Sequence, residues 1–290
     1  MLKGHLCKAT PASTSCDMEE VESEGTKKGR GLFFRVRVAI LLTILAGVLL
    51  YAWNDVRKRH ARNEWKRPLV VAFVVVREGP VSDASVERLR ARVPFLEQRL
   101  AEEMARYRET TAPPFQFQVL GPIDGPPPPP AAPAESGIID SAKYQWALHK
   151  WTSEVDSTGA YPSKGYDTRI YLYATPPAQS GRAEIEGLSE DGGTVGVVRV
   201  ELDESMADFT LFVATHETLH TLGATDKYAA DGSVLVPDGL PEPDHTPLYP
   251  QRFAEIMARH RAVSPSATKP PTSLAQLALG LKTAHEIGWH

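Results

Sequence analysis

The sequence predicts an α/β (α+β) domain with a mixed, mostly parallel, twisted sheet and helices, joined to one N-terminal transmembrane helix. The first observation is the continuous β-branched and apolar run at 69–76, which is typical of a strand buried on both faces of a sheet. The second is the alternation of strand-like and helix-like segments that follows it. The third is an uncharged apolar run at 38–53, which as a helix would span roughly 24 Å.

The composition is that of a globular protein with one substantial domain or two small ones. Of 290 residues, 42% are hydrophobic and 23% are charged, and the net charge of -4 leaves no basic excess for binding nucleic acid. Both cysteines, Cys7 and Cys16, lie in the first twenty residues. The rest of the chain therefore contains neither disulfides nor thiolate metal ligands.

The N-terminal region divides into three parts. Residues 1–31 are polar and small, so we expect a disordered tail, whose true start is either Met1 or Met18. Residues 32–53 are the expected transmembrane helix, because its central run, 38–53, has only Thr43 as a polar residue and ends in an aromatic belt, while Arg35 and Arg37 can reach the interface. Residues 54–67 form a charged stem. A cleaved signal peptide is less favoured, because no small-residue cleavage site precedes the end of the run.

The distribution of charge does not determine the direction in which the helix crosses the membrane, because basic residues lie on both sides of the apolar run. A short tail is the usual cytoplasmic partner of a single anchor. We therefore expect a single-pass protein of a bacterial inner membrane, with the lipid bilayer as a partner and the domain outside the cytoplasm.

The domain is expected to start at residue 68. A helix should run from Ser82 or Asp83 to about Arg108, with Pro94 kinking or splitting it. The further predicted segments are strands at 115–120, 168–174 and 195–202, a short edge strand around 183–188, and helices at 138–155 and 273–287. In the helix 138–155, core packing is favoured over a binding surface as the role of four large side chains: Tyr144, Trp146, Leu148 and Trp151.

The chemistry is concentrated in the stretch from Val213 to Asp226. If this stretch is helical, His216 and His220 are one turn apart and can hold one zinc ion, with Glu217 placed to reach a water molecule. Gly223 can end the helix in a left-handed turn, which would bring Asp226 back as the third ligand.

Two other residues compete with Asp226 for the third position. They are His245 and Glu242, in a loop rich in turn signals. The alternative to a metal site altogether is an amphipathic helix with two hydrogen-bonded histidines. The spacing of Gly223 and Asp226 behind the histidines favours the zinc site with Asp226.

These residues resemble the metzincin zinc peptidases, in the variant with Asp as last ligand that snapalysin and the immune inhibitor A peptidases carry. Met257 lies where the clan has a methionine-containing turn beneath the zinc. Some members carry a tyrosine two residues after that methionine. Here the position is Arg259, so no tyrosine role carries over, although Tyr228 is expected near the metal.

The resemblance implies a zinc metallopeptidase domain over residues 68–290, with the zinc helix beneath the cleft and a peptide or protein as substrate. Glu217 would act as general base, and His216, His220 and Asp226 would hold Zn²⁺. Two alternatives stay open. One is a membrane-anchored binding module that keeps zinc without catalysis, and the other is a zinc hydrolase acting on non-peptide substrates.

Overall fold

The computed structural model describes residues 28–110, 112–131, 137–162, 165–177, 186–189, 193–229 and 231–290. The predicted disordered tail thus lies almost wholly outside the described residues. The chain divides into two compact units, Met1–Asn54 and Asp55–His290. The first described element, α1 (Lys28–Asn63), extends from one unit into the other.

Helix α1 contains the predicted apolar run. It is long and apolar enough to cross a membrane, and the most apolar part of it is not buried against the protein. Its large apolar side chains, such as Leu45 and Leu50, are more than half exposed. A signal sequence near an N-terminus shows the same properties. The structure therefore establishes an N-terminal apolar helix that is either a membrane span or a signal sequence.

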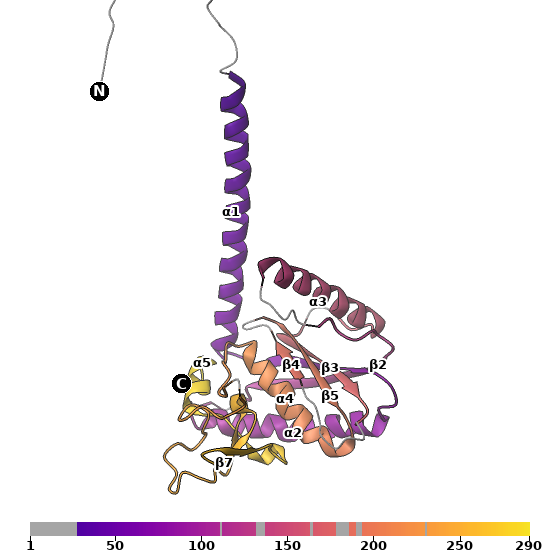
Figure 1. Cartoon of the computed structure of the whole chain (residues 1–290), viewed down its shortest axis with the longest axis vertical. Helices are drawn as coiled ribbons and strands as arrows, with labels where there is room; N and C mark the ends of the chain where they lie inside the picture. Colours follow the sequence, from indigo (N-terminus) through magenta and orange to yellow (C-terminus); the bar gives the residue numbers. More distant parts are fainter. Residues whose placement is uncertain are drawn as a thin grey trace, which may run out of the picture. The chain divides into compact units, whose positions relative to one another are not determined.

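A five-stranded sheet forms the centre of the second unit (Figure 1). Its strands are β1 (Leu69–Arg77), β2 (Phe115–Asp124), β3 (Thr168–Thr175), β4 (Glu186–Ser189) and β5 (Val195–Glu201). Their order is β2-β1-β3-β5-β4, in which the first four are parallel and the edge strand β4 is antiparallel to β5. The predicted mixed, mostly parallel sheet is confirmed.

Helices cover both faces of this sheet (Figure 1). Alternate residues of β1 point to opposite sides: Phe73 belongs to the core beneath α2 (Asp83–Ala105) and α4 (Ala207–His220). Val74 belongs to the core beneath α3 (Ile138–Thr158). Both β1 side chains are completely buried, as expected for a central strand with a helix layer on each side.

Helix α2 begins where the sequence predicts, since Ser82 accepts a hydrogen bond from the backbone N–H of Ser85. One helix continues through Pro94, so the predicted split does not occur. The neighbouring side chains Val93 and Leu96 are buried in the core, and their burial offsets the missing backbone hydrogen bond.

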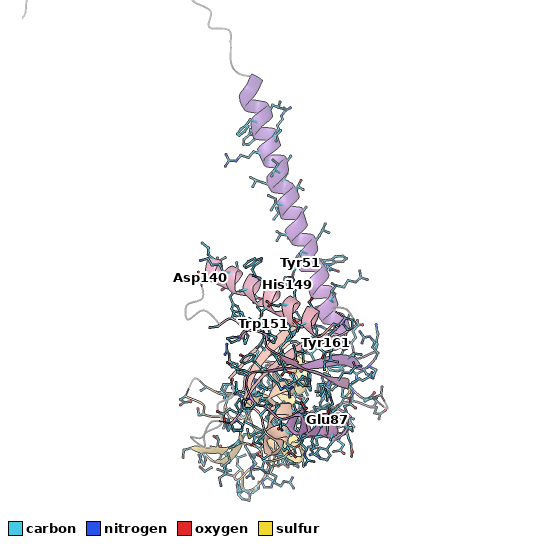
Figure 2. The ribbon with its side chains drawn as sticks, turned by 90° about the vertical axis from the view of Figure 1, so that its right-hand side faces the viewer. Tyr51, Glu87, Asp140, His149, Trp151 and Tyr161 are labelled. Atoms are coloured by element: carbon cyan, nitrogen blue, oxygen red, sulfur yellow. The ribbon has the colours of Figure 1, made fainter. Side chains whose placement is uncertain are left out.

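The core prediction for α3 is correct for some of its large side chains and wrong for one. Trp151, labelled in Figure 2, is buried. Its ring centroid lies 5.5 Å from that of Tyr171, and its Nε1 donates to the Pro127 carbonyl. Leu148 is also buried, whereas Trp146 is 70% exposed. Trp146 lies on the outer face of the helix, which the spacing of aromatic residues alone did not reveal.

The predicted C-terminal helix over 273–287 is wrong. This segment forms a 3-10 turn, η3 (Leu274–Gln276), a short strand, β9 (Leu277–Ala278), and a helix, α5 (Leu281–Glu286). Strand β9 pairs in parallel with β6 (Ala254–Glu255). The backbone of 277–278 thus pairs with residues 254–255, which lie 23 positions upstream, and this pairing interrupts the helical pattern. A second short pair, β7 (Arg261–Ser264) with β8 (Ala267–Lys269), was not predicted.

Candidate metal centre

Two histidines on the last turn of α4 form the base of the candidate site. His216 and His220 are one helical turn apart, and their Nε2 atoms lie 3.1 Å from each other. The helix is almost completely buried between the sheet and the C-terminal segment, so both imidazoles are held in protein rather than in solvent. Their arrangement on one face is the one predicted from the sequence.

Asp226 completes a triangle of possible ligand atoms. Its Oδ1 lies 3.3 Å from His216 Nε2 and 3.2 Å from His220 Nε2. Zinc at about 2.0–2.1 Å from each atom of a tetrahedral site requires ligand atoms about 3.3 Å apart. The three atoms therefore fit one zinc ion, which would leave a fourth position for water or substrate. The Asp226 side chain is 41% exposed, so the site is open on its side.

Backbone carbonyls orient both histidines. His216 Nδ1 lies 2.9 Å from the Ile256 carbonyl oxygen, and His220 Nδ1 lies 2.7 Å from the Ala224 carbonyl oxygen. A carbonyl only accepts, so each Nδ1 carries a proton, and in the neutral imidazole that binds a metal each Nε2 presents its lone pair. Such hydrogen bonds from the far ring nitrogen are typical of metal-binding histidines.

The turn after α4 brings Asp226 into place. Gly223 has φ of 97°, in the left-handed region. Its N–H donates to the His220 carbonyl, and the Ala224 N–H donates to the Leu219 carbonyl, at 2.9 and 3.1 Å. These two bonds form a Schellman turn, which ends the helix and reverses the chain.

Glu217 is the third member of a group that could hold a metal ion, together with His216 and His220. Its carboxylate is 4% exposed, and Oε1 lies 3.8 Å from His216 Nε2. This is beyond hydrogen-bond distance but within reach of a water molecule next to a metal. The position suits a base beside the metal.

The charges of the site favour a cation. Burial opposes ionisation of Asp226, but hydrogen bonds with His216 and His220 outweigh it and hold the pKa of Asp226 below its usual range. Burial likewise opposes protonation of His220, yet Asp226 and Glu217 raise its pKa above the ordinary value. A divalent cation bound here would displace the proton that these carboxylates favour on the imidazole.

The methionine turn lies directly against the histidines. The turn η2 (Ile256–Ala258) is fully buried, and the Met257 carbonyl accepts from the Lys227 N–H at 2.9 Å. The Tyr228 ring stacks on His216 with centroids 6.4 Å apart, so the expected proximity of Tyr228 to the site is observed. The Arg259 guanidinium lies 5.9 Å from the Tyr228 ring centre.

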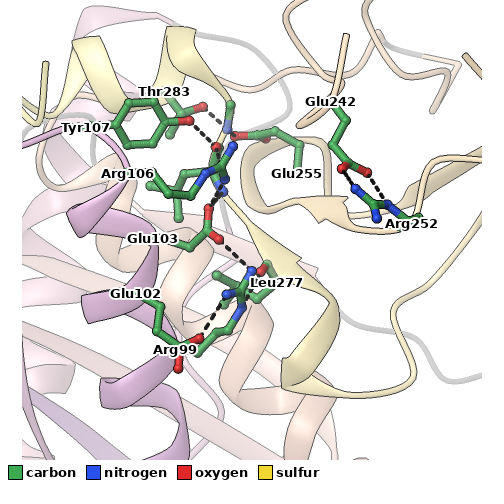
Figure 3. A network of polar contacts seen from close by, with 12 residues as sticks. Arg99, Glu102, Glu103, Arg106, Tyr107, Glu242, Arg252, Glu255, Leu277 and Thr283 are labelled. Carbon is green, nitrogen blue, oxygen red and sulfur yellow. Dashed lines mark hydrogen bonds and ion pairs between the residues drawn. The ribbon is translucent and has the colours of Figure 1, made fainter. Parts of the chain in front are cut away.

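The two competing third ligands are engaged elsewhere. Glu242 forms an ion pair with Arg252 (Figure 3). His245 is partly buried, and its Nδ1 lies 2.6 Å from the Pro247 carbonyl oxygen. The contacts of the described residues therefore favour Asp226.

The orienting carbonyls of Ile256 and Ala224, and the buried Glu255 before η2, were missed by sequence reasoning. Every residue has a backbone carbonyl, so the sequence does not mark which carbonyls will orient a histidine. Glu255 could have been found, because it is a single acidic residue within the apolar run of Phe253, Ala254, Ile256 and Met257.

Comparison with known proteins adds no assignment. No model of a known protein family matches the chain, and no curated protein sequence matches it significantly. The geometry alone shows that His216, Glu217 and His220 on α4 form a group that could hold a metal ion.

Proposed function

We propose that the protein is a membrane-anchored zinc endopeptidase in which His216, His220 and Asp226 hold the metal and Glu217 is the general base. The observation that carries the proposal is the triangle of His216 Nε2, His220 Nε2 and Asp226 Oδ1, with sides of 3.1 to 3.3 Å. A structural zinc site is usually closed by four protein ligands and needs no nearby base. Three ligands with a buried carboxylate beside them suit catalysis.

Zinc, when bound, would supply Lewis-acid polarisation of the scissile carbonyl and lower the pKa of the attacking water. Glu217 would accept the proton of that water and return it to the leaving amine. The buried position of Glu217 excludes competing solvent from its carboxylate. The Nδ1 hydrogen bonds of both histidines keep their Nε2 atoms aimed at one point.

The sheet supports a peptide substrate. Strand β4 is the edge of the sheet, antiparallel to β5, and β5 leads through η1 (Glu204–Met206) into α4. An extended peptide can bind such an edge as an added strand, with main-chain hydrogen bonds. The same sheet order supports the metzincin resemblance. The division into tail, span 32–53, stem 54–67 and peptidase domain 68–290 stays a prediction.

The test is cleavage of a diverse peptide library by the full-length chain in detergent, with product analysis by mass spectrometry. Glu217→Gln should lower the rate by about 10²- to 10⁴-fold while one zinc per chain remains bound, because only the base is lost. Glu204→Gln, at the exposed start of the same helix segment, is the matched control and should keep full activity.

Three outcomes separate the alternatives. Unchanged hydrolysis by Glu217→Gln would exclude the proposed base. Zinc binding without any peptide cleavage would favour a binding module or a hydrolase with another substrate. A chain that binds no zinc would overturn the site itself.

A further inference from the structure

We propose that Glu255 is a positioning residue of the metal centre, whose carboxylate joins the C-terminal segment 278–283 to the turn that orients His216. The inference rests on the proposed zinc site, and it assigns a role to a buried charged group that the proposed reaction does not use. Glu255 touches no reacting atom, so its effect would pass through the turn η2.

Three donors surround the Glu255 carboxylate, which is completely buried (Figure 3). Oε2 accepts from the Ala258 N–H at 2.9 Å. Oε1 accepts from the Gly280 N–H at 3.3 Å and from the Thr283 hydroxyl at 2.6 Å. One oxygen thus holds η2, and the other holds the chain just before and within α5.

The turn held by Glu255 contacts both sides of the candidate site. The Ile256 carbonyl, next to Glu255, fixes the Nδ1 of His216. The Met257 carbonyl binds the N–H of Lys227, the residue after Asp226. A displacement of η2 would therefore move one imidazole and the segment that carries the third ligand.

Stability alone does not account for a carboxylate in this position. Burial raises the pKa of Glu255 to about 7, although its three hydrogen bonds and nearby Lys227 oppose that rise. A buried carboxylate without a direct ion pair costs stability relative to a neutral side chain. What a carboxylate provides is acceptors on both oxygens, whereas the amide of glutamine has one oxygen and a donor.

Glu103 on α2 offers a matched control. It is also buried, and its Oε2 accepts from the Leu279 N–H at 2.9 Å. Arg99 and Arg106 pair with it (Figure 3). Glu103 thus holds the C-terminal segment one residue before Gly280, from the side of α2. Within the described part of the chain, Glu103 makes no hydrogen bond to η2.

The experiment compares full-length wild type, Glu255→Gln, Thr283→Val and Glu103→Gln in detergent. Zinc affinity is measured by chelator competition under conditions in which each metal-free variant is folded. The visible spectrum of the Co²⁺-substituted protein reports the geometry of the ligands. Substitution around metal-binding histidines typically weakens binding about 10- to 100-fold.

We expect Glu255→Gln to weaken zinc binding by about tenfold or more and to alter the Co²⁺ spectrum. Thr283→Val, which removes one hydrogen bond only, should weaken binding a few-fold and is informative even if Glu255→Gln does not fold. Glu103→Gln should lower the stability of the fold but leave zinc affinity and the Co²⁺ spectrum unchanged.

Wild-type affinity and spectrum in Thr283→Val and in any folded Glu255→Gln would overturn the inference and leave the proposed zinc site intact. Equal losses in Glu255→Gln and Glu103→Gln would also overturn it, because the effect would then be general loosening. A wild-type chain that binds no zinc would overturn the zinc site first.

Discussion

His216 and His220 each donate from Nδ1 to a backbone carbonyl, at 2.9 and 2.7 Å. The two acceptors belong to different segments, the methionine turn and the Schellman turn after α4. Single residues that shape these turns therefore affect the orientation of the two candidate ligands without touching them. Gly223 is the clearest case, since its φ of 97° lies where residues with a Cβ are strained.

Gly223→Ala should destabilise the metal-free protein by about 1–2 kcal/mol, the cost of an L-residue in the left-handed region. A Cβ at this position would meet no atom within 4 Å, so the cost comes from the backbone alone. Gly223→Asn should cost less, because asparagine tolerates this conformation better. Chemical denaturation measures both. If the alanine variant is instead stabilised, as glycine replacements at ordinary φ are, the turn is not left-handed.

At the scale of elements, the end of α1 belongs to the core of the second unit. Asn63 donates to the Leu222 carbonyl at 2.9 Å, next to the turn that ends α4. Trp65 is 8% exposed, packs edge-on against Phe115 and Trp289, and donates from Nε1 to the Ile287 carbonyl at 2.7 Å. The segment that leads out of α1 therefore stabilises both the first strands and the C-terminus.

Trp65→Ala should lower the free energy of unfolding by about 3–5 kcal/mol, because it leaves a large cavity and an unpaired Ile287 carbonyl. Trp146→Ala is the matched control. Its ring is 70% exposed, and its removal should change stability by less than about 0.5 kcal/mol. Denaturant titration of the two full-length variants measures the difference. Equal effects would show that the contacts of Trp65 contribute nothing beyond those of a surface residue.

At the scale of the whole molecule, α1 is the element that bears on where the protein is located. Its apolar side chains are exposed from Leu32 to Val56, which is unfavourable in water and favourable in hydrocarbon. A membrane span that is retained would keep the folded domain at a bilayer surface. A signal sequence that is cleaved would release the domain from the membrane.

We expect the intact chain of 290 residues in the membrane fraction after expression. Replacing Ile44 and Leu45 by arginine should abolish stable insertion, since each charge at a helix centre costs about 2.5–3.5 kcal/mol. The measurement is membrane fractionation with intact-mass spectrometry of the recovered chain. A soluble chain that has lost the apolar run would identify a signal sequence instead.

The sequence by itself determined the features that depend on local pattern. The run at 69–76 predicted a central strand because β-branched side chains on both faces require cover on both sides. The spacing of His216 and His220 placed both on one helix face, and Gly223 predicted the turn behind them. These features hold because neighbours along the chain are enough to produce them.

Only the tertiary structure decided the features that depend on distant partners. The segment 273–287 has a helical pattern, yet its centre pairs with Ala254–Glu255. Trp146 and Trp151 look alike in the sequence, but only one of them faces the sheet. For Asp226 the local spacing already favoured it over Glu242 and His245, and the structure added the distances of its Oδ1 to both imidazoles. Backbone pairing and burial are set by residues far apart in the chain, and no local pattern records them.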